Sequence, residues 1–432
     1  MQVKRILILG SGGREEVLAS AYAKNKNTEK IYIAPGNGLT GFKDKKILPL
    51  PHVYSNNFDA IVAACKKYNI DLVDVAQDEP LSLGFVDKLK EKNISVFGPS
   101  KNSSELEWNK EYSRNFMKKY KIPTPEYASF SDTKKATAYI RNLKEQALFV
   151  KASGLALGKG ALYAASKKEA INHLEEMKQF GKSGETFLIE ECMTGEEFSF
   201  FVICDGASYV MVGAAQDHKR IYNHDQGPNT GGMGCVFPSL IVDKKITQDV
   251  EERIIKPLID GMIKEGRAYS GILYIGGMLT NKGVKVVEFN CRWGDPEAEV
   301  ILPSLKTDYL RIVEAVINGT LGKIKITNDN LTRVSVAACA LGYPNDYDNV
   351  KGKAIFGLEK KVNAIIFGAG IKKQNNKYLV SGGRVVHVVG EGNDINEARR
   401  HAYSAISEIY IAENNLYYRT DIGWRDVERL IK

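Results

Sequence analysis

The chain has 432 residues, of which 44% are apolar and 26% are charged, a composition typical of a globular protein with packed cores. At roughly 150 residues per domain, this length favours about three domains. The apolar runs stay below the ~18 residues that a transmembrane helix needs, and the net charge of +8 is spread over scattered lysines. The sequence therefore excludes a membrane-spanning protein, and it offers no basic tract for a nucleic-acid partner.

Residues 1–100 alternate short apolar runs with helical patterns, which predicts βαβ units and a parallel sheet. The first run leads directly into a glycine turn, as a buried first strand does and a signal peptide does not, so we expect a cytoplasmic protein. Ligands of such sheets bind at the carboxyl ends of the strands. The runs that we interpret as strands are Arg5–Leu9, Ile31–Ala34, Leu72–Ala76 and Ser95–Phe97.

A glycine-rich turn, GSGGR at residues 10–14, follows the first of these runs. Glycines at this place let the backbone approach a phosphate group at a helix N-terminus. A dinucleotide-binding fingerprint would need a further glycine where Glu15 stands. The turn therefore favours a small phosphate or phosphosugar, with Arg14 nearby, over NAD. A tight turn without a ligand is the alternative.

A second glycine loop, KASGLALGKG at residues 151–160, lies between two strand-like runs. The spacing of Gly154 and Gly158 does not fit the Walker pattern, so we interpret the loop as a flap that joins two antiparallel strands. Lys151 and Lys159 would supply positive charge for phosphates. A hairpin without a ligand is the alternative. The two prolines of IPTPEY, at Ile122–Tyr127, mark a boundary before this region.

Four acidic residues gather between two further strand-like runs: Glu190, Glu191, Glu196 and Glu197. In isolation such a cluster is typical of a solvated face. At a connection between two subdomains, the same carboxylates would offer acceptors for an adenine amino group and for ribose hydroxyls.

The most specific pattern is VVEFNCRWGDPE at residues 286–297. Alternation along a strand predicts that Glu288, Asn290 and Arg292 point to one face. Carboxylate and amide oxygens suit Mg²⁺ held jointly with nucleotide phosphates, and an arginine beside them can stabilise a transferred phosphoryl group. A solvent-facing edge strand is the alternative, which the following GDPE makes less attractive.

A long polar loop follows the sequence QDHKR at residues 216–220 and contains GPNTGGMG at residues 227–234. A loop of this length inside a compact domain indicates a function, and we interpret it as a loop that covers a substrate. After Asn328 the pattern becomes β-rich, which predicts a last boundary there. None of the cysteines forms a CxxC pair, so we expect free, mostly buried thiols at Cys65, Cys192, Cys204, Cys235, Cys291 and Cys339.

Taken together, these motifs resemble the ATP-grasp superfamily and, within it, the phosphoribosylamine–glycine ligase family. The matching text covers nearly the whole chain: GGRE, APGN, FGP, GLALGKG, IEE…GEE, QDHKR, GPNTGGMG, EFNCRWGDPE, SGGRV and DIGWR. The resemblance implies an N-terminal parallel α/β domain (residues 1–103), a split ATP-grasp core (104–330) with a mobile lid (about 123–195), and a small β-rich C-terminal domain (331–432).

The resemblance also implies a reaction: ATP phosphorylates the glycine carboxylate, and the amine of 5-phosphoribosylamine attacks the resulting glycyl phosphate. The implied metal ligands for Mg²⁺ or Mn²⁺ are Glu288 and Asn290, and the implied catalytic residues are Arg292, Lys151 and Asp217. The implied ATP contacts are Lys110, Lys151, Gly154, Gly158, Lys159, Gly160, Glu190 for adenine and Glu197 for ribose. The implied substrate contacts are Gly12, Gly13, Arg14, Asp78, Asp217, Lys219, Asn229, Arg292, Asp295, Gly383 and Arg384. Small molecules would be the only partners, and we expect a monomer.

The sequence departs from the residues that are usual in the family motifs at Glu16, Ala76–Asp78, Ser153 and Trp293. Three of these departures lie near the amine substrate or the flap and would affect substrate affinity more than the chemistry. The competing interpretations are an ATP-grasp ligase that uses formate or bicarbonate, a dinucleotide-binding regulator, and a nucleic-acid-binding protein. The first is disfavoured by GPNTGGMG, and the second has no need of the EFN strand.

Overall fold

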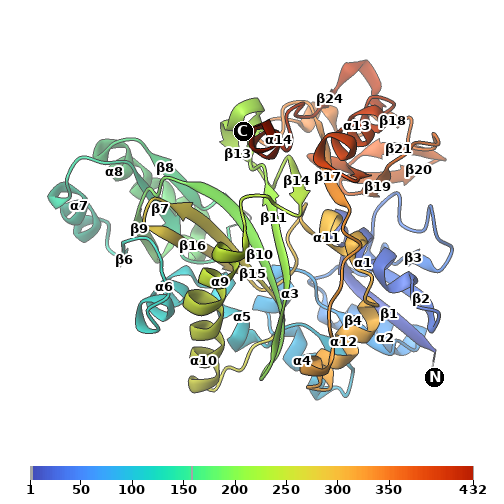
Figure 1. The fold of residues 1–432 in the computed structure, drawn as a ribbon, viewed down its shortest axis with the longest axis horizontal. Coiled ribbons are helices and arrows are strands. Elements are labelled where there is room, and N and C mark those ends of the chain that lie inside the picture. Colours follow the sequence, from blue (N-terminus) through green and yellow to red (C-terminus); the bar gives the residue numbers. More distant parts are fainter. Residues whose placement is uncertain (1–2, 157–158, 432) are drawn as a thin grey trace.

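The N-terminal part is a five-stranded sheet in the order β3-β2-β1-β4-β5 with every pair parallel, as the alternating runs predict. The computed structural model describes residues 3–156 and 159–431, so the predicted flap residue Gly158 lies outside the described residues. The strands are β1 (Lys4–Gly10), β2 (Thr28–Pro35), β3 (Ile47–Pro49), β4 (Leu72–Asp74) and β5 (Val96–Phe97). The helices are α1 (Gly13–Ala23), α2 (Phe58–Tyr68), α3 (Asp78–Ser82) and α4 (Phe85–Glu91), which lie in the blue part of Figure 1.

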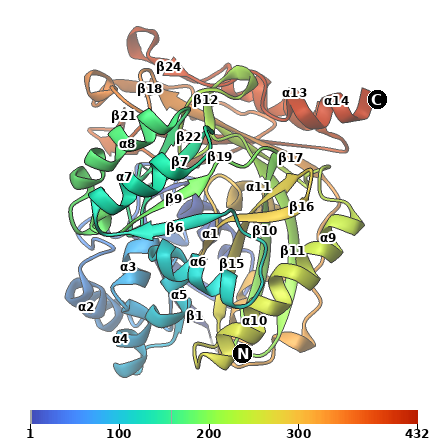
Figure 2. The same ribbon diagram turned by 90° about the vertical axis from the view of Figure 1, so that its left-hand side faces the viewer.

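A small antiparallel sheet of order β6-β9-β7-β8 forms the predicted lid region, which the helices α5 (Lys101–Trp108) and α6 (Lys110–Lys119) precede. Its elements are β6 (Tyr127–Phe130), α7 (Thr133–Asn142), β7 (Leu148–Ala152), β8 (Ala161–Ala164), α8 (Lys167–Glu176) and β9 (Phe187–Glu191). Side chains of this region pack into an apolar cluster of their own, which includes Ile140, Val150 and Leu174. The lid therefore has its own core, and in Figure 2 its helices face the viewer.

The largest sheet runs in the order β16-β15-β10-β11-β14-β17-β22-β19 and crosses the predicted boundary at residue 330. Its core strands are β10 (Glu196–Asp205), β11 (Tyr209–Asp217), β14 (Gly234–Phe237), β15 (Ser270–Thr280) and β16 (Gly283–Asn290). Its C-terminal strands are β17 (Thr332–Ala340), β19 (Ile365–Gly368) and β22 (Arg384–Gly392), with β24 (Leu416–Tyr417) beside β17. Because β14 pairs with β17, the core and the C-terminal region share one sheet.

Helices pack beside the large sheet: α9 (Lys244–Val250), a π-helical turn at Glu251–Ile255, α10 (Lys256–Lys264), α11 (Ala298–Ser304) and α12 (Tyr309–Ile317). A second C-terminal sheet contains β18 (Ala354–Phe356), β20 (Ile371–Gln374), β21 (Lys377–Val380) and β23 (Tyr410–Ile411). The C-terminal helices are α13 (Ile395–Ile406) and α14 (Trp424–Ile431). A short ribbon of β12 (Arg220–Tyr222) and β13 (Gln226–Asn229) projects from the core. In the described part of the chain no helix is long and apolar enough to cross a bilayer. All six cysteines are free, and only Cys192 is not buried.

Candidate functional site

A cavity of about 160 Å³ lies where the lid sheet, α6 and the strand β16 meet. Loop residues Leu155 and Ala156 border it, which places the glycine loop next to this space. It brings together predicted site residues that are far apart in the sequence: Asp78, Lys110, Lys151, Glu288, Asn290 and Arg292. Two residues that the sequence analysis did not single out, Glu107 and Arg114, also line it.

The charges in this cavity favour an ionised carboxylate at Glu288. Burial disfavours the charged form, but Lys219, Lys110 and Lys151 together hold the pKa of Glu288 below its usual value. Burial in turn lowers the pKa of Lys110, although Glu288 opposes this shift. A charged carboxylate and the amide oxygen of Asn290 thus share one space with two lysines, which is the ligand set expected for a divalent cation and polyphosphate.

The carboxylate of Glu190 is held by two cations. Arg114 pairs with one oxygen at 2.6 Å, and the ammonium of Lys151 lies 2.6 Å from the other. Burial opposes ionisation, yet these partners lower the pKa of Glu190 to about 2. The buried carboxylate of Glu190 therefore fixes Lys151 in the cavity. The contact of Glu190 with adenine stays a prediction.

Arg292 lies beyond the strand on which it was expected. The strand β16 ends at Asn290, so simple alternation does not place the arginine side chain. Its guanidinium nevertheless donates to Asn290 Oδ1 at 3.1 Å and pairs with Glu107 Oε1 at 3.0 Å. Glu107 also accepts from the backbone N–H of Cys291 at 2.7 Å, which ties the turn to α5. The Arg292 side chain therefore lies beside Asn290, as the sequence predicts. It is held there by Glu107 and Asn290 rather than by strand alternation.

The described parts of the glycine loop form the end of the β7–β8 hairpin. The N–H of Gly154 donates to Ser183 O at 2.9 Å, and Ala152 N–H donates to Gly160 O at 2.8 Å. Lys159 is exposed. A side chain at Gly154 would lie 2.8 Å from the backbone of Ser183, so this glycine is required by close packing.

A second group of predicted residues lies around Arg384 at the start of β22. Its guanidinium donates to Gly231 O at 2.6 Å and to Asp295 O at 2.9 Å, and it pairs with Asp295 Oδ1 at 3.0 Å. Gly383 packs against Tyr343, whose ring would be 2.1 Å from an added Cβ. Arg384 thus ties the loop of residues 227–234 to the GDPE turn.

The carboxylate of Asp217 is buried beside this group. Burial, and then the neighbouring carboxylate of Glu297, raise the pKa of Asp217 well above its usual value. Its Oδ1 has no hydrogen-bond partner. Lys219 pairs instead with Glu197 at 2.8 Å, so the predicted ribose contact also positions a substrate-side lysine. Asn229 lies exposed on the β12–β13 ribbon, where it is paired with Arg220.

Arg14 is less available than the sequence suggests. It is buried, and it donates to Glu15 Oε1 at 2.8 Å and to Trp293 O at 3.1 Å. Glu15 also accepts from Gly12 N–H at 2.6 Å, which uses one of the free amides at the start of α1. An added Cβ at Gly13 would lie 2.4 Å from Glu299 Oε1. This turn is therefore shaped by packing as well as by any phosphate that it binds.

Sequence reasoning missed Glu107, Arg114 and Glu297. Arg114 lies one helical turn after Lys110 on α6, so the i, i+4 spacing could have suggested a shared face. Glu297 was visible in the GDPE motif, and its Oε1 accepts from Ser199 at 2.8 Å. Glu107 carried no local signal, because its partners Cys291 and Arg292 are distant in the chain.

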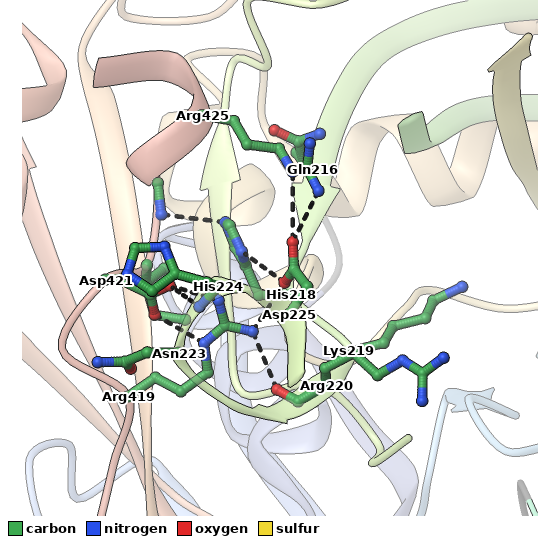
Figure 3. Close-up of polar contacts among 12 residues, drawn as sticks. Gln216, His218, Lys219, Arg220, Asn223, His224, Asp225, Arg419, Asp421 and Arg425 are labelled. Atoms are coloured by element: carbon green, nitrogen blue, oxygen red, sulfur yellow. Dashed lines mark hydrogen bonds and ion pairs between the residues drawn. The ribbon is translucent and has the colours of Figure 1, made fainter. Parts of the chain in front are cut away.

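A network of charged side chains joins the loop that contains QDHKR and GPNTGGMG to the C-terminal part of the chain (Figure 3). We call it the C-terminal clasp and define it as His218, Asp225, Arg419, Asp421 and Arg425. Arg419 is fully buried and makes two bonds of 2.8 Å to Asp421 and one of 2.9 Å to Asp225. Arg425 pairs with the other oxygen of Asp225 at 2.9 Å. His218 Nε2 accepts from Gly423 N–H at 3.0 Å. The motifs QDHKR and DIGWR therefore meet in one network.

We predict that Arg419→Met destabilises the protein by about 3 kcal/mol, because it leaves Asp421 without its arginine and removes one of the two arginines that pair with Asp225. The control is Arg400→Met, since Arg400 is 71% exposed and lies 3.7 Å from Glu397, a surface pair of little energetic value. Urea unfolding followed by circular dichroism compares the two variants. Equal midpoints would contradict a stabilising role for the clasp.

The comparisons with known proteins cover nearly the whole chain. Models described as the N domain, the ATP-grasp (A) domain and the C domain of phosphoribosylglycinamide synthetase match residues 4–107, 108–298 and 333–425. A phosphoribosylamine--glycine ligase from Caldanaerobacter subterraneus is 37% identical, and the match covers 97% of this chain and 99% of that protein. The chain belongs to the phosphoribosylglycinamide synthetase family.

Other relatives agree with this family. The trifunctional purine biosynthetic protein adenosine-3 of Gallus gallus is 39% identical over 98% of this chain, which spans 42% of that longer protein. The crystal structure of phosphoribosylamine--glycine ligase from Thermotoga maritima matches 97% of this chain and 100% of its own, with a TM-score of 0.82 and 32% identity. A biotin carboxylase from Campylobacter jejuni, 18% identical with a TM-score of 0.71, shares the fold and covers 98% of this chain and 99% of its own.

Proposed function

We propose that this chain joins 5-phosphoribosylamine and glycine at the expense of ATP, giving glycinamide ribonucleotide, ADP and phosphate. The observation that carries the proposal is the single cavity lined by Lys110, Lys151 and Glu288, in a member of the phosphoribosylglycinamide synthetase family. Membership of this family indicates the substrates. The cavity provides lysines for the phosphates of ATP and an ionised carboxylate for a divalent cation.

In the first step a glycine carboxylate oxygen attacks the γ-phosphorus, the bond to the ADP oxygen breaks, and glycyl phosphate forms. Lys110 and Lys151 bind the phosphates, and Arg292 faces the position through which the phosphoryl group passes. The 151–160 loop closes over them and excludes water, which would otherwise hydrolyse the acyl phosphate.

A divalent cation fits the oxygens of Glu288 and Asn290, because Glu288 is held ionised and both line the cavity. When bound there, Mg²⁺ or Mn²⁺ would neutralise charge on the phosphate oxygens.

In the second step the amine nitrogen of phosphoribosylamine attacks the acyl carbon, the carbon–oxygen bond to the phosphate breaks, and the nitrogen loses a proton. Two residues of the cavity and the residues on the side of the second group would hold the two substrates. The cavity residues are Asp78 and Arg292, and the others are Gly12, Gly13, Arg14, Asp217, Lys219, Asn229, Asp295, Gly383 and Arg384. Asp217 lies among buried charges beside Glu297, and we assign it to orienting a substrate amine. We further propose a monomer that acts in the cytoplasm.

The test is ADP release from ATP, measured with each substrate omitted in turn. The proposal requires that ADP release depend on both glycine and freshly prepared phosphoribosylamine. Equal release with formate or bicarbonate in place of glycine would favour a different ATP-grasp ligase and overturn the proposal.

We predict that the 151–160 loop closes when nucleotide binds. Leu155 and Ala156 border the cavity while Lys159 is exposed, so a bound triphosphate would add contacts to this loop. Hydrogen exchange in peptides covering residues 151–160 should slow when a non-hydrolysable ATP analogue is added, and peptides from β15 should not change. Equal exchange with and without the analogue would count against a lid.

A further inference from the structure

Three side chains from separate elements, two of them buried and one half-buried, converge behind the glycine turn of α1. Asp295 lies in the turn after β16, Glu299 on α11 and His387 on β22. One oxygen or nitrogen of each lies within 4.8 Å of the other two. Glu299 and His387 are completely shielded from solvent. The cluster thus joins the core to the C-terminal region, directly beneath Gly13.

Polar atoms of this cluster lack hydrogen bonds. Both carboxylate oxygens of Glu299 and both ring nitrogens of His387 have no hydrogen-bond partner. These are four of the fourteen such atoms among the described residues. Buried polar atoms without partners are costly, so their concentration at one point indicates a missing occupant.

A shared proton is the simplest occupant, but it supplies only one donor. Arg384 pairs with Asp295 Oδ1 at 3.0 Å and does not satisfy Glu299. His387 Nε2 lies 3.4 Å from Asp295 Oδ1 and 3.9 Å from Glu299 Oε1. Atoms bound to one zinc ion at ~2.1 Å in tetrahedral geometry lie about 3.4 Å apart, which is close to these separations.

We infer that Asp295, Glu299 and His387 form a binding site for a divalent transition-metal ion of the zinc type. An imidazole nitrogen with two carboxylates is a ligand set that zinc accepts, whereas Mg²⁺ prefers oxygen ligands alone. This site is distinct from the nucleotide-linked site at Glu288 and Asn290. Its ion holds α11 to β22 and fixes the packing of Glu299 against Gly13. Arg384 shares Asp295 and weakens the attraction for a cation, so we expect micromolar affinity.

The test is zinc binding to the full chain without nucleotide. After treatment with a chelator, the protein is dialysed to equilibrium against a known micromolar concentration of free Zn²⁺, and the bound metal is measured by mass spectrometry as the excess over the dialysate. Wild type should retain one ion per chain. Loss of a supporting residue costs about 10–100-fold in metal affinity, so loss of a direct ligand should cost at least as much. Glu299→Gln and His387→Gln should therefore retain none.

Two control variants separate this site from others. Glu288→Gln alters the nucleotide-linked site, and His401→Gln removes a histidine on α13 that contacts Glu391 O; both should keep the ion. A readout without any variant is the visible absorption of Co²⁺-loaded wild type, which Zn²⁺ should abolish. Wild type that retains no zinc and gives no such spectrum, or retention that survives both ligand substitutions, would overturn the site.

Discussion

Glu288→Ala and Asn290→Ala are each expected to lower kcat by about 10³-fold or more, because a metal that stabilises transferring charge contributes several kcal/mol to the transition state. Both side chains line the cavity beside Lys110 and Lys151, and Glu288 is held ionised by these cations. Without these two ligands the metal would not be held, and the unneutralised phosphates would also repel the attacking glycine carboxylate. Steady-state ADP release at saturating Mg²⁺ measures the loss.

A matched substitution separates the charge of Glu288 from its size. Glu288→Gln keeps the shape and removes the charge, so it should be almost as inactive as the alanine variant. Asp249→Ala removes a carboxylate on α9 that pairs with Arg253 in the following π-helical turn. This substitution should leave kcat unchanged. Circular dichroism confirms that each variant is folded. Near-normal activity of Glu288→Ala would remove this residue from the metal site.

Arg292→Ala is expected to lower kcat by about 10²–10³-fold while the KM for ATP changes little, since a preorganised cation acts mainly where charge develops. The guanidinium is fixed by Glu107 and Asn290, and nearby carboxylates, Glu107 first, overcome the effect of burial and raise its pKa, so it stays charged. Arg292→Lys keeps the charge but loses the planar fork, so it should restore activity only in part. Kinetics at varied ATP concentrations separate the two parameters.

The position of Arg292 also supplies a control. Glu107→Gln removes the ion pair that orients the guanidinium and leaves the arginine in place. It should therefore lower kcat less than Arg292→Ala does. If Arg292→Ala raises only the KM for ATP and leaves kcat unchanged, the residue binds ground-state ATP and the assigned role is wrong.

The parallel sheet and the lid hairpins could be predicted from the sequence because their signals are local. Arg5–Leu9 and Leu72–Ala76 are apolar runs that turns terminate; β1 covers the whole of the first run, and β4 lies within the second. The continuity of the large sheet across residue 330 could not be predicted. It depends on the pairing of Cys235 with Ser335, two residues that no local pattern connects.

The candidate site likewise has features that a local sequence pattern predicts and features that depend on long-range packing. Glu288 and Asn290 belong to one short motif on one strand, so their common direction follows from the period of a strand. The sequence also drew attention to DIGWR and QDHKR, but it could not place Arg419 against Asp225, because this ion pair depends on packing across 194 residues. Nothing in the sequence indicated that Arg14 is buried and paired with Glu15, and its contact with a phosphate stays a prediction.

Oxygen transfer from glycine to phosphate tests the central claim most directly. Glycine labelled with ¹⁸O in its carboxylate is incubated with ATP, phosphoribosylamine and enzyme, and the released phosphate is analysed by mass spectrometry. If glycyl phosphate forms, the oxygen that bridged carbon and phosphorus leaves with the phosphate, so each phosphate should carry one labelled oxygen. Unlabelled phosphate formed together with the amide product would contradict the account.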